Sequence, residues 1–155
     1  MRSTRACTVS RWALTRDRLA RARRHCYNVR QTQHLQEDSP LEPVELARAI
    51  VNLATDKKGE DIVLMDMRQV SPITDYFVIF SATSDRQLRA IIEHVSEEIK
   101  KQHSIQYWHI EGDPSNGWVL LDYADVVVHG FLPDRRAYYD LEGLWREAPV
   151  VVHIR

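Results

Sequence analysis

Two short apolar runs most constrain what this chain can fold into. Residues 62–67 and 76–80 are apolar almost throughout, and Ser71 and Pro72 mark a turn between them. Runs of this length, bounded by turn residues, are typical of central strands that other elements cover on both faces. The chain is therefore expected to build a sheet with helices packed against it.

The segment after the second run is a predicted helix. Ser84 and Gln87 have the spacing of a capping box, and apolar residues then recur with a helical period up to about His103. A strand followed by a helix and another strand requires a right-handed crossover, so we expect a partly parallel sheet. An earlier helix with the same apolar period is predicted between Pro43 and Gly59.

Shorter elements are predicted in the second half of the chain. Strands are expected over residues 105–110, 118–121 and 126–128, and a last helix is expected to start near Asp134 and to dock on the sheet. Residues 122–125 are too few for anything but a tight turn. The last two strands are therefore expected to form a hairpin.

The chain divides by composition into a leader, one domain and a short tail. Residues 1–40 hold nine arginines and three acidic residues, and we predict that this Arg-rich leader is disordered. A dispensable bacterial extension, a mitochondrial presequence and a misassigned start all fit this composition. Residues 41–148 are expected to form a single α/β domain, a mixed β-sheet of about five strands flanked by helices. Residues 149–155 are expected to be a C-terminal tail.

The charge of the chain is distributed unevenly. The formal charge of the whole is −1, whereas residues 41–155 hold twelve basic and nineteen acidic residues, which makes that part −7. An acidic domain repels nucleic-acid phosphates and attracts basic surfaces. We therefore expect no direct nucleic-acid readout by the core, and we favour a basic protein as the partner.

The positions of the cysteines and the lengths of the apolar runs argue against a disulfide in the core, a structural zinc site and a membrane span. Cys7 and Cys26 both lie in the leader, so no disulfide can join parts of the core. Their distances from His25 and His34 lack the paired spacing of a structural zinc site. No apolar run approaches the roughly 18 to 20 residues of a membrane span. We expect no metal, no cofactor and no membrane partner.

The motifs of common enzymes are missing from the sequence. The five glycines form neither a phosphate-binding loop nor a Gly-x-Ser-x-Gly nucleophile turn. The closest carboxylate pairs, Glu111 with Asp113 and Asp140 with Glu142, fall in a predicted turn and on a predicted surface helix. We therefore expect no catalytic residue, and we predict that the protein is not an enzyme.

The predicted hairpin brings aromatic and acidic side chains together. Because side chains alternate across a strand, Trp118, Leu120 and Asp122 are expected to share one face. Aromatic anchors beside carboxylates are common in protein interfaces, so we interpret the segment as an edge hairpin that binds a partner. The predicted partner-binding residues are Trp118, Leu120, Asp122, Tyr123, Asp125, Val126, His129, Tyr138 and Tyr139.

Structural roles are the alternative for several of these residues. A solvated turn beside a half-buried Trp118 would give the same sequence pattern. Tyr138 and Tyr139 could instead anchor the last helix. Asp125 and His129 share a face of the strand, which favours a hydrogen-bonding or interface role over an acid–base pair.

Three motifs resemble the ribosomal silencing factor, or Iojap-like, family. The motifs are Asp66 with residues 71–81 and 83–87, the hairpin segment 117–131, and residues 136–145. The resemblance covers Leu41 to about Ala148. The family usually has glycine where this chain has Ala82 and Ala124, which concerns the backbone of two turns.

The resemblance implies a fold related to the nucleotidyltransferases and a function in translation. Such a factor binds the large ribosomal subunit through its basic ribosomal protein fourteen, sterically blocks joining with the small subunit and represses translation under nutrient limitation. The resemblance also allows a homodimer when the factor is free. The expected localisation is cytoplasmic, or mitochondrial if the leader is a presequence. The alternatives are an RNA-binding ribosome assembly factor that uses the basic leader, and a nucleotidyltransferase-type enzyme.

Overall fold

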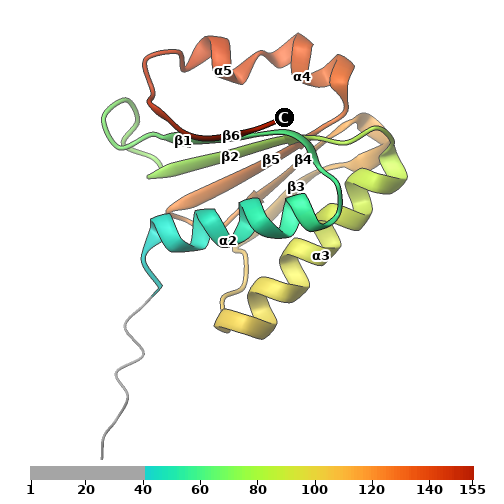
Figure 1. Ribbon diagram of the computed structural model, residues 1–155, viewed down its shortest axis with the longest axis horizontal. Helices are drawn as coiled ribbons and strands as arrows, with labels where there is room; N and C mark the ends of the chain where they lie inside the picture. Colours follow the sequence, from blue (N-terminus) through green and yellow to red (C-terminus); the bar gives the residue numbers. More distant parts are fainter. Residues whose placement is uncertain (1–40) are drawn as a thin grey trace, which may run out of the picture. The chain divides into compact units, whose positions relative to one another are not determined.

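The structure of the chain is a computed structural model that describes residues 41–155. The predictions made for the leader, residues 1–40, lie outside the described residues. The described part contains one six-stranded mixed sheet with helices on both faces (Figure 1). This confirms the predicted fold class, whereas the relation to nucleotidyltransferases stays a prediction.

The sheet has the strand order β3-β4-β5-β2-β1-β6. Its strands are β1 (Glu60–Asp66), β2 (Tyr76–Ser81), β3 (His109–Asp113), β4 (Trp118–Asp122), β5 (Val126–Phe131) and β6 (Val150–Ile154). β2 and β5 are parallel, and the other neighbouring strands are antiparallel. The predicted parallel component is therefore a single strand pair, which the chain completes after it has crossed one face of the sheet as a helix.

The described residues form four α-helices, which cover the sheet in two pairs. They are α2 (Pro43–Asp56), α3 (Asp85–His103), α4 (Pro133–Tyr139) and α5 (Leu141–Leu144). Figure 1 shows α2 and α3 on one side of the sheet and α4 and α5 on the other. Ile50 of α2 and Ile91 of α3 are fully buried in the cluster that these two helices form with the strands. Burying a side chain of this size contributes about 1.5 to 3 kcal/mol, so the α2–α3 layer is a main source of stability.

The start of α3 shows half of the predicted capping box. The backbone N–H of Gln87 donates to Ser84 Oγ at 3.2 Å, as predicted. The Gln87 side chain does not return to Ser84: its Oε1 accepts from the Thr83 N–H at 2.8 Å, and its Nε2 donates to the Lys58 carbonyl at 2.8 Å. Gln87 thus ties the start of α3 to the loop after α2. No helix of residues 41–155 is long and apolar enough to cross a bilayer.

The predicted C-terminal tail is a strand, and the sheet has six strands where about five were expected. Residues 150–154 pair with β1 in antiparallel register, and the Asp66 N–H donates to the Pro149 carbonyl at 2.9 Å. Val150, Val151 and Val152 are β-branched and favour extended backbone. The outer edge of β1 supplies the hydrogen-bonding partners that such a short run cannot find alone.

The predicted strand over residues 105–110 is shifted toward the C-terminus. β3 begins at His109, and its register places Asp113 opposite Trp118. Ile105 and Tyr107 are apolar, as a strand would require, but they pack against the α2–α3 cluster as irregular chain. The turn between β3 and β4 is correspondingly shorter, and residues 114–116 form a single 3₁₀ turn.

The predicted last helix is broken in two. Asp140 has φ of 40°, in the left-handed region, where it ends α4 and caps α5 by accepting from the Gly143 N–H. Leu141 and Trp145 pack against the sheet as expected. Tyr138 and Leu144 are 76% and 68% exposed, so only part of this segment docks on the sheet.

The hairpin of β4 and β5 forms as predicted, but it does not lie at the edge of the sheet. β4 pairs with β3 on one side, and β5 pairs with β2 on the other. Ala124 in its turn has φ of 70°, a conformation in which glycine would be unstrained. We call the side of the sheet beneath α2 and α3 the covered face, and the opposite side of β3, β4 and β5 the open face.

Candidate functional site

The open face is the side of the hairpin that no helix packs over completely. Leu120 is half-buried there, and its cross-strand neighbours are Glu111 of β3 and His129 of β5. In the next row, Asp122 lies between His109 and Val127. The burial of β4 alternates along the strand, which confirms that Trp118, Leu120 and Asp122 share a face.

Aromatic rings form the centre of the open face. The Trp118 ring stacks on Phe131 with centroids 5.5 Å apart and contacts Tyr139 of α4 at 4.6 Å. The Tyr138 ring meets Tyr139 edge-on at 5.1 Å and is largely exposed. The aromatic surface therefore continues from the sheet onto α4.

His129 is buried in this aromatic cluster rather than hydrogen-bonded. Its ring lies edge-on to Phe77 at 4.9 Å and stacks on Trp118. Neither ring nitrogen has a hydrogen-bond partner among the described residues, and Trp118 Nε1 has none either. Burial lowers the pKa of His129 to about 4, so the ring is neutral at pH 7. Of the two roles predicted for Asp125 and His129, hydrogen bonding or interface, no hydrogen bond forms between them, because aromatic rings surround the imidazole.

Carboxylates lie at the turn end of the open face. Asp122 Oδ1 accepts from the Ala124 N–H at 2.7 Å, and Oδ2 lies 4.0 Å from His109 Nδ1. Asp125 is exposed, while its backbone carbonyl accepts from Asp75 and from Thr74 Oγ1. The turn backbone is thus fixed by hydrogen bonds, and Asp125 keeps its carboxylate in solvent.

Two of the predicted contact residues lie on the covered face. Tyr123 and Val126 are 5% and 0% exposed and belong to the α2–α3 cluster. Tyr123 packs edge-on against Tyr107, and burial raises the pKa of its phenol. Alternation along the strand could have predicted the burial of Tyr123, since Tyr123 follows Val119 and Leu121 on the same side. These residues stabilise the hairpin and cannot meet a partner.

Sequence reasoning missed four residues of the open face. They are Phe77 of β2, His109 and Glu111 of β3, and Phe131 of β5. Phe77 joins the hairpin only through the pairing of β2 with β5, which are distant in sequence. His109 and Glu111 were missed because the strand before the hairpin was predicted too early in the sequence. Phe131 lies in β5 itself, and alternation from His129 could have identified it.

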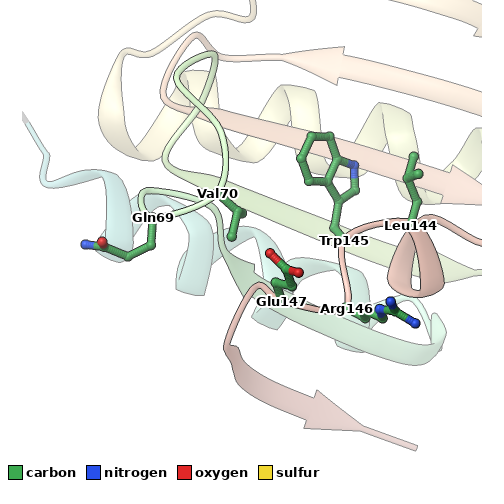
Figure 2. Close-up of a pocket in the computed structure, with 6 residues that line it drawn as sticks. All are labelled: Gln69, Val70, Leu144, Trp145, Arg146 and Glu147. Atoms are coloured by element: carbon green, nitrogen blue, oxygen red, sulfur yellow. The ribbon is translucent and has the colours of Figure 1, made fainter.

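A pocket of about 430 Å³ lies beside the start of β6, between the β1–β2 loop and the end of α5. Figure 2 shows Gln69 and Val70 on one side, Leu144 and Trp145 on the other, and the Glu147 carboxylate between them. Trp145 contacts Phe77 with ring centroids 6.3 Å apart, so this pocket borders the aromatic cluster.

A network of polar and charged side chains around Arg136 connects α4 to the sheet. Arg136 Nη1 donates to the Asp61 carbonyl at 2.6 Å and to Ser81 Oγ at 2.8 Å, and the guanidinium also pairs with Glu142. His153 Nε2 lies 2.6 Å from Asp61 Oδ1, and this hydrogen bond lowers the pKa of Asp61. Each charge in this group faces an opposite charge or a hydrogen-bond partner, so its role is structural. Glu142, expected to be solvated, belongs to this network.

Residues 41–155 contain no group of three His, Cys, Asp or Glu side chains placed to hold a metal ion. Asp66 pairs with Arg68 at 2.5 Å. Asp85 accepts from the Arg86 N–H at the start of α3. The candidate site in the described residues is therefore the open face, where aromatic rings lie beside carboxylates.

Comparison with known proteins gives consistent similarities. The family model described as "Ribosomal silencing factor during starvation" matches residues 40–155. The ribosomal silencing factor RsfS of Halalkalibacterium halodurans is 42% identical over 107 residues, which cover 69% of this chain and 91% of that protein. "Mitochondrial assembly of ribosomal large subunit protein 1" of Mus musculus is 36% identical over 98 residues, 62% of this chain and 43% of that protein. A crystal structure of a Chromobacterium violaceum protein is 34% identical and superposes with a TM-score of 0.64, covering 67% of this chain and 86% of that one.

Proposed function

The chain belongs to the ribosomal silencing factor family, and from this premise we propose that it binds the large ribosomal subunit through ribosomal protein fourteen. In this proposal the bound factor blocks joining of the small subunit and so represses translation under nutrient limitation. The observation that carries it is the open face, an aromatic surface with carboxylates beside it that α4 covers only in part.

The composition of the open face supports a protein partner. Trp118, Tyr138 and Tyr139 are of the residue types that dominate binding energy in protein interfaces. Asp122, Asp125 and Glu111 stand around them as groups that can pair with lysine or arginine. The charge of −7 on residues 41–155 would steer this face toward a basic protein and away from exposed RNA phosphates.

The proposed mechanism is steric. The factor occupies the surface at which the two subunits meet, so the small subunit cannot join while the factor is bound. Such a mechanism requires a rigid domain and a reversible interface, and it requires no bond to be made or broken. We accordingly propose a regulator rather than an enzyme, with a cytoplasmic location, or a mitochondrial one if residues 1–40 are a presequence. A homodimer of the free chain is the remaining part of the proposal.

A role in assembly of the large subunit is the second candidate. The mouse relative carries that role in its name, and the nine arginines of residues 1–40 could contact RNA phosphates. A binding constant that falls steeply with salt, and loses that dependence when residues 1–40 are deleted, would favour this candidate over subunit blocking.

The test is co-sedimentation with isolated subunits, followed by a joining assay. We expect the chain to sediment with large subunits and not with small ones, and to lower the yield of joined ribosomes as its concentration rises. Equal binding to both subunits, or full joining at saturating factor, would contradict the proposal.

Charge variants locate the binding surface. Asp122→Lys should reduce binding to large subunits strongly, because like charges brought together in an interface cost several kcal/mol. Asp122→Asn keeps an oxygen that can accept from the Ala124 N–H and removes only the charge, so it should fold normally and bind with intermediate affinity. Glu97→Lys makes the same change of charge at an exposed position on α3 and should bind like the parent. Equal losses in Asp122→Lys and Glu97→Lys would mean that overall charge, not the open face, determines binding.

A further inference from the structure

The pocket between the β1–β2 loop and the end of α5 contains a carboxylate that the described chain leaves unpaired. Figure 2 shows the Glu147 carboxylate directed between Val70 and the Trp145 indole, whereas the Gln69 and Arg146 side chains point away from this centre. Within residues 41–155 this carboxylate takes part in no ion pair. It is therefore available to a positively charged group from outside the described chain.

The pocket lies at the same end of the sheet as the carboxylates of the open face. The β1–β2 loop is tied to the β4–β5 turn, because Thr74 Oγ1 donates to the Asp125 carbonyl at 2.8 Å. From the other side of the pocket, Trp145 contacts Phe77 of the aromatic cluster with ring centroids 6.3 Å apart. The pocket therefore continues the open face beyond β5 and β2.

We propose that this pocket binds a cationic side chain, arginine or lysine, of the basic protein that covers the open face. The inference rests on the proposed function and adds a second contact to it. The Glu147 carboxylate pairs with the cation, and the Trp145 ring packs against it, because indole is the aromatic group that attracts cations most strongly. Val70 and Leu144 provide apolar walls for the methylene stem of the side chain.

The lining argues against other kinds of occupant. Sites for small molecules are lined mostly by hydrophobic side chains, whereas Gln69, Arg146 and Glu147 make half of this lining polar or charged. A phosphate or a carboxylate would require the Arg146 guanidinium inside the pocket, and Figure 2 shows it pointing outward. The charge of −7 on residues 41–155 adds to the attraction for a cation.

Substitution of the carboxylate tests the contact directly. Glu147→Gln keeps the shape of the side chain and removes its charge, so it should weaken binding of the full chain to isolated large subunits about tenfold. Urea unfolding should not change, because Glu147 is exposed and has no ion pair within the described residues. Glu97→Gln, the same change on the exposed side of α3, is the matched control and should bind like the parent. Parental binding in Glu147→Gln, or an equal loss in Glu97→Gln, would overturn the inference.

The neighbouring positive charge tests the sign of the occupant. Arg146→Gln removes a positive charge beside the proposed cation, so it should bind large subunits slightly more tightly than the parent. A loss of binding in Arg146→Gln together with parental binding in Glu147→Gln would mean that the pocket binds an anion, which would overturn the inference.

The arginines of residues 1–40 are the other basic groups that could enter the pocket. There they would compete with the partner, so Glu147→Gln would bind large subunits more tightly than the parent. That result would overturn the inference. A loss of affinity in Glu147→Gln instead supports a cation from the partner.

A carbodiimide, which couples carboxylates to amines, distinguishes the two cationic side chains. A link between Glu147 and a lysine of a ribosomal protein, located by mass spectrometry of the treated complex, would assign a lysine. A tenfold loss in Glu147→Gln without such a link would assign an arginine, because a guanidinium does not couple.

Asp122→Lys, measured in the same series, separates failure of this inference from failure of the proposed function. If the parent binds large subunits, Asp122→Lys does not and Glu147→Gln binds like the parent, the proposed function stands and the pocket contact is overturned. A parent chain that does not bind large subunits would overturn both.

Discussion

The two faces of the sheet are made by the same strands and differ in chemistry. The covered face is mainly aliphatic: Leu121 and Val128 are fully buried beneath α2 and α3, and Tyr76, Phe80 and Tyr123 are the aromatic residues of the same cluster. The open face is aromatic, and it contains Trp118 Nε1 and a His129 ring whose polar atoms have no partner among the described residues. A fourth such atom, Tyr123 Oη, lies on the covered face. Unpaired polar atoms are costly in a core, so their larger number on the open face favours a role for this face besides stability.

The contrast between the faces shows how one strand, β4, can contribute both to stability and to recognition. Side chains alternate along β4, so Leu121 contributes to the core while Leu120, its neighbour, stays half-exposed on the open face. Stability and recognition can therefore be changed independently by substitutions one residue apart. The predictions that follow use this separation.

The largest expected effect compares Leu121→Ala with Leu120→Ala. Leu121→Ala should lower the free energy of unfolding by about 2 to 5 kcal/mol, because it leaves a cavity in a fully buried cluster. Leu120→Ala should lower it by less than half as much and should weaken binding to large subunits. Urea unfolding curves and co-sedimentation measure the two quantities. Equal losses of stability would mean that the open face is as much a core as the covered one.

The next effect is the pH dependence that His129 gives to stability. Its pKa is about 4 in the folded chain and close to 6.5 when unfolded, so between these values the unfolded chain binds the extra proton. The stabilising contribution is complete above pH 6.5 and is lost as pH falls toward 4, with a maximum loss on the order of 3 kcal/mol. Urea unfolding measured from pH 7 to pH 4 should show this decline.

A substitution of His129 tests whether this residue of the open face causes the loss of stability at low pH. His129→Phe keeps a ring in the aromatic cluster and removes the titrating nitrogens, so its stability should change less over the same range. Asp61, whose pKa is lowered, contributes only at more acidic pH, because its stabilisation is lost as pH falls below the ordinary aspartate range. A parental pH dependence in His129→Phe would mean that another group is responsible.

The elements predicted most closely from sequence are those with a local signal. β1, β2, α2 and α3 follow from apolar periodicity and from Ser84 at the start of α3, and their observed bounds agree closely with the predicted ones. β6 and the break at Asp140 depend on contacts with β1 and on a left-handed backbone, which no local pattern contains. The site residues divide in the same way, into those with a local sequence signal and those that depend on strand pairing. Alternation placed Trp118, Leu120 and Asp122 correctly, whereas Phe77 and Glu111 join them only through strand pairing.

The smallest effect compares two exposed aromatic residues on opposite sides of the molecule. Tyr138 on α4 is 76% exposed beside the open face, and Trp108 before β3 is 74% exposed on the side of the covered face. Truncating either to alanine removes little buried surface, so neither variant should change the free energy of unfolding by more than about 0.5 kcal/mol. If the open face binds the partner, only Tyr138→Ala should weaken binding to large subunits, by about 1 to 2 kcal/mol, because an aromatic at an interface contributes only where the partner desolvates it.

Comparing Trp108→Ala with Tyr138→Ala shows whether binding to large subunits depends on where an exposed aromatic residue lies or only on its being exposed. Trp108→Ala removes a larger ring from an equally exposed position, so a contact that depended only on exposed aromatic area would suffer more from it than from Tyr138→Ala. Retained binding in Trp108→Ala together with a loss in Tyr138→Ala would localise recognition to the open face. The reverse result would move the ribosomal contact to the surface around Trp108, before β3.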